Sequence, residues 1–204
     1  MKFIFASNNA HKIEELQHIF TQLQIPISII SQKEFLGEKN IDVEENGKTL
    51  EENARIKAET LFALTGMPVI ADDTGLEVVS LQNAPGVLSA RYAGEHGNDK
   101  ANREKLLSVL GNENNRAARF RTVLYFKDSL DEFFVEGLCE GTIAYHEHGD
   151  KGFGYDSLFI PNGYTETFAQ MNIEEKNIIS HRAKASFALA KTLSSLIASR
   201  NINE

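Results

Sequence analysis

The sequence lacks the features of secreted and membrane proteins. Its 204 residues include a single cysteine, Cys139, so no disulfide forms within the chain. No apolar run approaches the roughly eighteen residues of a membrane span. The apolar stretch at the N-terminus is too short for the core of a signal peptide. We therefore expect a folded cytoplasmic protein in which Cys139 is a small buried side chain.

Basic residues are also in short supply. Lysine and arginine number 21 against 29 acidic residues, and the formal net charge is −8. A surface of this sign repels the phosphate backbone of a nucleic acid, since affinity for that backbone needs clustered cations. A small anionic ligand stays compatible with this composition, because a few local basic groups suffice to hold it. We expect a small-molecule partner, with no nucleic acid polymer and no membrane.

The apolar patterns alternate between the strand and the helix period, which predicts an α/β protein. The sequence favours a single domain over 1–204 with a mixed, twisted central sheet flanked by helices, and two lobes with a cleft between them. We predict strands at 2–6, 25–30 and 68–72, helices at 11–24, 50–65, 99–111 and 180–199, and a long hairpin of 118–127 with 132–144. Ser180 is the expected cap of the last helix.

The segment VIADDTGLEV (69–78) ends an apolar run in adjacent carboxylates. Asp, Thr and Gly favour turns, so we predict that the chain reverses here and continues as a strand at 76–81. Neighbouring residues of a strand point to opposite faces, so Asp72 and Asp73 should have different roles, one facing the cleft and the other holding the loop.

A second acidic group lies in DVEENG (42–47). Taken alone, this group is typical of a solvated acidic loop. Together with the aspartates at 72–73 it has a second interpretation, because Mg²⁺ usually takes one or two protein carboxylates besides water and phosphate oxygens.

Cationic side chains occur at the N-terminal end of two predicted helices. Lys12 lies in the first helical turn after SNNAHK (7–12), and His181 and Arg182 begin the last helix, with Lys176 a short loop earlier. The helix dipole disfavours a cation at this end, and a bound anion such as phosphate would explain it. We interpret the two helix starts as binding sites for parts of one phosphorylated ligand, although SNNAHK is also an ordinary capped turn.

The glycine-rich loop HGDKGFGYD (148–156) offers Phe153 and Tyr155 for stacking on a flat ligand, or is an ordinary loop. Other motifs fail. In NGKT (46–49) the first P-loop glycine would fall on Asp42, and GFGY lacks the third glycine of a dinucleotide fingerprint. His146 and His148 have no further metal-ligand partner, and no G-x-S-x-G elbow is present.

The ordered motifs SNNAHK, EENG, NARIKA, ADDTGLEV, PGVLSARYAG, GFGYDSLFIP and EEKNIISHRAKA resemble the inosine/xanthosine triphosphate pyrophosphatase family, from about residue 2 to about residue 195. The resemblance implies a homodimer that hydrolyses deaminated purine nucleoside triphosphates (ITP, dITP, XTP) to the monophosphate and pyrophosphate, with Mg²⁺. Two alternatives stay open at this point: a Maf-like pyrophosphatase of modified pyrimidine nucleotides, and a non-catalytic nucleotide-binding module, which would not need the carboxylates.

The resemblance also implies roles for individual residues. The triphosphate would be bound by Ser7, Asn8, Asn9, Ala10, His11 and Lys12. The metal would be bound by Glu44 and Asp73, with Asp73 also the base that activates water. Further substrate contacts would come from Lys57, Thr74 and Arg91. The base and sugar-phosphate would be surrounded by Phe153, Gly154, Tyr155, Asp156, Lys176, His181 and Arg182. For His181 and Arg182 the implied partner is the 6-keto oxygen of the purine, an acceptor that adenine replaces with a donor.

Overall fold

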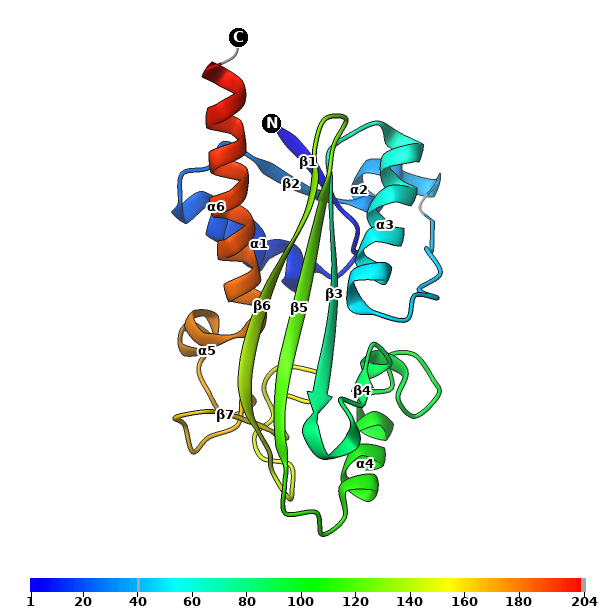
Figure 1. Ribbon diagram of the computed structural model, residues 1–204, viewed down its shortest axis with the longest axis vertical. Coiled ribbons are helices and arrows are strands. Elements are labelled where there is room, and N and C mark those ends of the chain that lie inside the picture. The colour runs from blue at the N-terminus through cyan, green and yellow to red at the C-terminus, as the bar shows by residue number, and fades with distance from the viewer. Residues whose placement is uncertain (40, 203–204) are drawn as a thin grey trace. The chain divides into compact units, whose positions relative to one another are not determined.

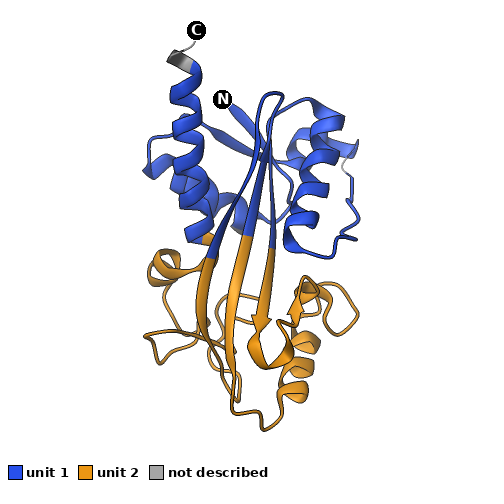
Figure 2. Ribbon diagram, viewed as in Figure 1, with its two compact units in different colours: residues 1–73, 123–137, 183–204 blue, residues 74–122, 138–182 orange. Residues whose placement is uncertain are grey.

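The computed structural model describes residues 1–39 and 41–202, and it shows a mixed α/β protein (Figure 1). The chain forms two compact units. The first contains Met1–Asp73, Val123–Gly137 and the chain from Ala183 onward, and the second contains Thr74–Thr122 and Leu138–Arg182 (Figure 2). Among the described residues, no helix combines the length and the apolar character that a membrane crossing requires.

The elements follow in this order: β1 (Lys2–Phe5), α1 (Ala10–Gln22), β2 (Ser28–Ser31), α2 (Gln32–Leu36), η1 (Gly37–Lys39), α3 (Leu50–Thr65), β3 (Val69–Val78), η2 (Val79–Leu81), β4 (Pro85–Gly86), η3 (Ser89–Arg91), α4 (Asp99–Leu110), β5 (Ala117–Lys127), β6 (Glu132–Ile143), β7 (Phe159–Pro161), α5 (Ile173–Ile179) and α6 (His181–Ile202).

The strands form a mixed sheet in the order β2-β1-β3-β5-β6-β7, with β4 paired to β3. Strand β1 runs parallel to β2 and β3, whereas β4 is antiparallel to β3 and β7 is antiparallel to β6. The residues of β3, β5 and β6 are divided between the two units. The predicted α/β class with a mixed sheet is confirmed, and the cleft stays a prediction.

The core of the first unit forms where α1 and α6 pack against the strands. Leu16, Ile19 and Phe20 line one face of α1 at helical spacing and contact Leu189 and Leu193 of α6 within one buried cluster. Figure 1 shows α1 and α6 on one side of these strands and α3 on the other. The helices therefore hold the ends of β1 and β3 in fixed positions.

The second unit has a core of its own. Leu106 and Leu110 of α4 belong to one buried cluster with Phe159 of β7, Phe168 of the following loop, and apolar side chains of β3, β5 and β6. Cys139 belongs to this cluster and is buried, as the sequence predicts. The packing fixes the loop between β6 and α5, which carries several candidate site residues.

The predicted turn at 72–75 is wrong. Strand β3 runs without interruption over ten residues, Val69–Val78. A side chain at Gly75 would place its Cβ only 2.6 Å from the carbonyl oxygen of Gly86 in β4, so the glycine permits the close approach of that strand. The chain reverses farther along, where Gln82 and Asn83 adopt positive φ angles of 54° and 66°.

Several predicted boundaries are confirmed. Thr49 caps α3, accepting a hydrogen bond from the Glu52 N–H at 3.1 Å, and Gly66 ends this helix in the left-handed conformation. The β5–β6 hairpin forms around residues 128–131. Ser180 directly precedes α6 and ends α5, where its N–H donates to the Lys176 carbonyl oxygen, so its predicted role as the cap of the last helix stays a prediction. The short elements α2, α5, β4 and β7 were not predicted, because they span too few residues for a periodic pattern.

Candidate active site

Several charged and amide side chains meet in the first unit at the middle of β3. We call this group the carboxylate cluster, which consists of Lys12, Glu45, Asn53, Lys57, Asp72 and Asp73. Strand β3 supplies the two aspartates, α1 supplies one lysine, α3 supplies Asn53 and Lys57, and Glu45 lies in the loop that precedes α3. Because helices on both sides of the strand contribute, the cluster depends on the core of this unit.

Asp72 is paired with Lys12. The Lys12 Nζ donates to Asp72 Oδ2 at 2.6 Å, and the side chain of Asp72 is only 2% exposed. The cation in the first turn of α1 therefore has its anion within the chain. This corrects the reasoning that a phosphate is needed to explain Lys12, and the binding of phosphate by Lys12 stays a prediction.

The SNNAHK segment forms the turn between β1 and α1. Asn9 caps the helix, its Oδ1 accepting from the Lys12 N–H at 3.3 Å, and Ser7 Oγ accepts from the Asn9 N–H at 3.1 Å. Asn8 Oδ1 accepts from the Lys33 N–H at 3.2 Å, and Ala10 is the first residue of α1. The side chain of His11 lies outside the part that the structure describes. The segment is thus a helix N-terminus, the kind of place that binds phosphate.

Asp73 has the chemistry of a base. Its Oδ2 accepts from Asn53 Nδ2 at 3.0 Å. Burial raises the pKa of the Asp73 carboxyl to about 6, and the carboxylates of Glu45 and Asp72 add to this rise, while Lys57 opposes it. A carboxyl group with a pKa near neutrality can take a proton from water and release it again.

Lys57 lies among three carboxylates. Its Nζ donates to Glu45 Oε1 at 2.7 Å. Burial alone would lower the pKa of Lys57, but the negative charges of Asp72, Asp73 and Glu45 raise it above its ordinary value. Lys57 therefore carries a positive charge at physiological pH.

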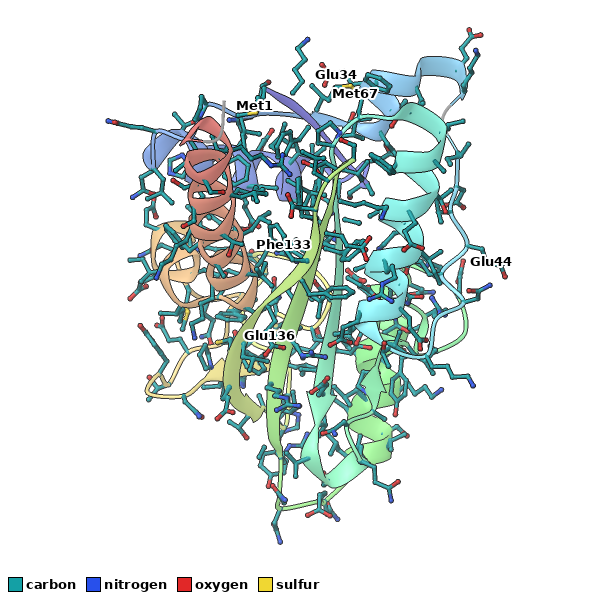
Figure 3. The ribbon with its side chains drawn as sticks, turned by 45° about the horizontal axis from the view of Figure 1, so that its top comes forward. Met1, Glu34, Glu44, Met67, Phe133 and Glu136 are labelled. Carbon is teal, nitrogen blue, oxygen red and sulfur yellow. The ribbon has the colours of Figure 1, made fainter. Side chains whose placement is uncertain are left out.

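Glu45, and not Glu44, is the glutamate of the carboxylate cluster. Glu44 is exposed, and Figure 3 shows its side chain pointing outward from the loop. Its neighbour Glu45 is half-buried, pairs with Lys57 and interacts electrostatically with Asp73. The metal-binding role that the resemblance implies for Glu44 stays a prediction, and Glu45 is a second candidate for it. Two adjacent glutamates look alike in the sequence, and only the course of the loop distinguishes them.

The oxygen ligands of this cluster suit a hard cation. In residues 1–39 and 41–202, no group of three or more His, Cys, Asp or Glu side chains is arranged to hold a metal. Mg²⁺ typically takes one or two protein carboxylates beside water and substrate oxygens, and Asp73 and Glu45 are candidates for them, so the metal stays a prediction.

A second group of site candidates lies in the second unit. We call it the aromatic–cation cluster, which consists of Phe120, Phe153, Asp156, Phe168, Lys176, His181 and Arg182. The Arg182 guanidinium lies 5.2 Å from the centre of the Phe153 ring, and the Lys176 Nζ lies 5.6 Å from it. Phe153 is 42% exposed, whereas both cations are buried. The cluster thus presents an open aromatic ring with cations beside it, which suits a flat, electron-rich ligand.

The loop that carries Phe153 is held firmly. Asp156 Oδ2 accepts from the Phe153 N–H at 2.9 Å and from Lys176 Nζ at 2.6 Å. Gly152 has a φ of +75°, and a Cβ there would lie 2.1 Å from the same carboxylate, so the position requires glycine. The Gly154 N–H donates to Asp99 Oδ2 at 2.7 Å, and its carbonyl accepts from Arg103 Nη1 at 2.8 Å. Helix α4 therefore fixes this loop.

His181 is stacked on an aromatic ring at the start of α6. Its ring centre lies 4.5 Å from that of Phe120, with 15° between the ring planes, and His181 is 3% exposed. The stacking fixes the plane of the imidazole, so its ring nitrogens point in defined directions. Lys176, His181 and Arg182, which the sequence singled out together, are thus members of one cluster.

Tyr155 does not fit the predicted stacking role. It is 4% exposed, and its hydroxyl donates to the Ser89 carbonyl oxygen at 2.9 Å. Burial raises the pKa of Tyr155 far above its ordinary value. The ring is a core residue of the second unit and has no open face for a base, which leaves Phe153 as the stacking candidate.

Thr74 and Arg91 lie elsewhere in the second unit. The Thr74 and Thr122 hydroxyls are 2.8 Å apart on neighbouring strands, and Arg91 is the half-buried last residue of η3. Thr74 follows Asp73 directly in β3, so its side chain points to the opposite face of the strand.

The model of the Ham1 family matches residues 3–192. The chain belongs to the Ham1 family. It is 44% identical over 194 residues to a protein of Christiangramia forsetii, covering 95% of this chain and 100% of that protein. It is 49% identical to a protein of Porphyromonas gingivalis, covering 90% and 93% of the two chains. Both relatives are named dITP/XTP pyrophosphatase.

A solved Ham1 protein confirms the fold. The Ham1 protein of Staphylococcus aureus superimposes with a TM-score of 0.86 at 40% identity, covering 96% of this chain and 99% of that one. The family and the α/β fold predicted from the motifs are therefore confirmed for this member of the Ham1 family.

The sequence did not predict some of the residues that form or support the two clusters of this Ham1 protein. Asn53 precedes Lys57 by four residues and so shares a face of α3 with it, a signal that was available. Phe120, Asp99 and Arg103 support the aromatic–cation cluster from β5 and α4. No local pattern marks these three residues, because their partners lie far along the chain.

Proposed function

We propose that this protein hydrolyses deaminated purine nucleoside triphosphates, ITP, dITP and XTP, to the nucleoside monophosphate and pyrophosphate. The observation that carries the proposal is the name dITP/XTP pyrophosphatase of relatives that are 44% and 49% identical over nine-tenths or more of this chain. The carboxylate cluster and the aromatic–cation cluster supply the groups that such a reaction needs.

In this proposal the carboxylate cluster acts on the triphosphate. Asp73 accepts the proton of the attacking water, and with a pKa of about 6 it is mostly ionised at neutral pH. Lys57 stays protonated among its carboxylates and offers a cation to the phosphates. The N–H groups at the start of α1, together with Lys12, bind anionic oxygens.

We propose Mg²⁺ as the cofactor, held by Asp73 and Glu45. Support comes from these two carboxylates. Burial of Asp73 and the negative charge of Glu45 both raise the pKa of Asp73, so the two groups interact. When bound, the ion neutralises charge on the phosphates and lowers the barrier to displacement. Without ligand, Lys57 pairs with Glu45. In the complex with nucleotide, a phosphate oxygen would be an alternative partner for Lys57.

The aromatic–cation cluster would recognise the base. Phe153 stacks on the purine, and the donors of His181 and Arg182 match the 6-keto oxygen of hypoxanthine or xanthine, with Lys176 near the Phe153 ring. Adenine carries an amino donor at the same position, so donor would face donor. A site built to donate to an oxygen rejects such an analogue strongly, because its buried donors are left unsatisfied.

A panel of nucleotides tests the proposal. Pyrophosphate release is measured for ITP, XTP and dITP beside dUTP and 5-methyl-UTP, each with and without Mg²⁺. We expect release from the three purine nucleotides only, and only with the metal. Preference for the pyrimidine nucleotides would indicate a Maf-like enzyme, and binding of ITP without release would indicate a non-catalytic module. We also propose a homodimer, which sedimentation equilibrium tests.

A further inference from the structure

Asn53 connects the two parts of the carboxylate cluster. It is completely buried in the first turns of α3. Its Nδ2 donates to Asp73 Oδ2 at 3.0 Å, and its Oδ1 accepts from the Gly47 N–H at 2.8 Å. Asp73 lies on β3, and Gly47 lies two residues after Glu45 in the preceding loop. One side chain thus ties the strand that bears one carboxylate to the loop that bears the other.

The carboxamide of Asn53 satisfies both partners. The carboxylate of Asp73 needs a donor, and the Gly47 N–H needs an acceptor, so a buried side chain between them must offer one of each. Aspartate at this position would offer acceptors alone and would repel Asp73. The contact with the loop is close, since a Cβ on Gly47 would lie 2.7 Å from Asn53 Oδ1.

The same face of α3 also holds Glu45 directly. Lys57 lies one helical turn after Asn53, and its Nζ contacts Glu45 Oε1 at 2.7 Å. Asn53 fixes the backbone of the loop and Lys57 fixes its carboxylate. Lys57 is a proposed phosphate ligand and is therefore free to change partners, whereas Asn53 has no other role in the proposed reaction.

We infer that Asn53 is a positioning residue, which holds the carboxylates of Asp73 and Glu45 at the spacing that a divalent cation requires. The inference rests on the cation site of the proposed function. Residues that orient metal ligands typically cost about 10- to 100-fold in metal affinity or activity when they are removed.

The chain offers a matched control in Asn102. It is the fourth residue of α4 after the cap Asn98, as Asn53 is the fourth residue of α3 after the cap Thr49. It is 1% exposed, its Oδ1 accepts from the Ala93 N–H at 2.7 Å, and its Nδ2 donates to the Ala90 carbonyl at 3.2 Å. Asn102 therefore performs the same loop-to-helix function but touches no carboxylate.

The experiment compares Asn53→Ala with Asn102→Ala in the full-length protein. Mn²⁺ binding without nucleotide is measured by electron paramagnetic resonance, kcat and KM for ITP are measured at saturating Mg²⁺, and thermal unfolding reports stability. We expect Asn53→Ala to bind Mn²⁺ about 10- to 100-fold more weakly and to lose kcat, with KM changed less than about threefold. Asn102→Ala should lower the midpoint of unfolding by a similar amount and bind Mn²⁺ as the wild type does.

Three results would overturn the inference: Mn²⁺ affinity and kcat of Asn53→Ala equal to those of the wild type, an equal loss of Mn²⁺ affinity in Asn102→Ala, or no Mn²⁺ binding by the wild type. If Asn53→Ala does not fold, Asn53→Ser replaces it in the same comparison, since serine is too short to reach Asp73. A wild type that binds Mn²⁺ but does not hydrolyse ITP would contradict the proposed function alone, because the metal titration contains no nucleotide.

Discussion

The ammonium group of Lys12 lies 2.6 Å from a carboxylate oxygen of Asp72. The next residue, Asp73, has a different partner, the carboxamide of Asn53 at 3.0 Å. Successive side chains of β3 point to opposite faces, and the two aspartates form these hydrogen bonds with different helices, while both charges act on Lys57 of α3. The adjacent carboxylates thus have different hydrogen-bond partners, and the different roles expected of them stay a prediction. Asp72 joins the strand to α1, and Asp73 is the candidate for chemistry.

The Lys12–Asp72 pair should contribute to stability. Asp72→Asn leaves the Lys12 ammonium beside an uncharged partner, and a hydrogen bond between charged groups is worth about 1.5–3 kcal/mol. We expect the free energy of unfolding in urea to fall by that amount. In a double-mutant cycle with Lys12→Met, the second substitution should cost less in the Asp72→Asn background than in the wild type. Strict additivity of the two changes would show that the ion pair contributes nothing.

Asp73→Asn should stabilise the metal-free protein at pH 7. Burial raises the pKa of Asp73 from 3.8 to about 6, so the folded protein binds this proton more tightly than the unfolded chain does. The contribution is therefore favourable below about pH 4 and is lost as the pH rises through about 6. Two pKa units correspond to about 3 kcal/mol, and we expect a gain of about 1–3 kcal/mol in the free energy of unfolding.

Urea unfolding of wild type and Asp73→Asn at pH 4 and pH 7, with a chelator present, measures this gain. The difference between the two proteins should be small at pH 4 and appear at pH 7. A gain of the same size at both pH values would contradict the assigned cause, because it would not follow the charge of Asp73.

The two adjacent glutamates should differ in their effect on activity. Glu45→Gln removes a carboxylate that contacts Lys57 and interacts with Asp73, so we expect kcat to fall at least about tenfold and the Mg²⁺ concentration for half-maximal rate to rise. Glu44→Gln changes an exposed side chain and should leave both values within about twofold. The opposite ranking would favour Glu44 as the metal ligand.

Substitutions of the two aromatic residues of the glycine-rich loop should also have different effects. Phe153→Ala removes an exposed ring proposed to stack on the base, an interaction worth about 1–3 kcal/mol, so KM for ITP should rise roughly five- to hundredfold. Tyr155→Phe removes the hydroxyl that donates to Ser89 and should cost about 1 kcal/mol of stability with KM unchanged. Steady-state kinetics and urea unfolding of both variants test this division, and a raised KM in Tyr155→Phe would contradict it.

Local signals predicted most of the fold. The Thr49 cap and Gly66 marked the ends of α3 in the sequence, because both act through their own neighbours. The turn predicted at 72–75 failed for the opposite reason. Asp, Thr and Gly favour turns, yet here the glycine permits the approach of Gly86, a partner that no local pattern reveals. Pairing between strands overrode the local preference.

The sequence predicted site residues that a local motif marks. It did not predict roles that depend on a contact with a residue far along the chain. Asp73 and Lys57 were named from motifs, and the structure brings them into one cluster. The counter-ion of Lys12 is sixty residues away in the chain, so the sequence suggested a phosphate instead. Tyr155 looked like a stacking residue because it follows Gly154 in the glycine-rich loop, but its packing makes it a core residue.

Product release from ITP and ATP, with wild type and Asp73→Asn in the presence of Mg²⁺, tests the central claim most directly. We predict one pyrophosphate and one inosine monophosphate per ITP, with ATP at least about a hundredfold slower. Asp73→Asn should bind ITP and release almost no pyrophosphate. Release of orthophosphate, equal rates for ATP and ITP, or wild-type turnover by Asp73→Asn would contradict the account.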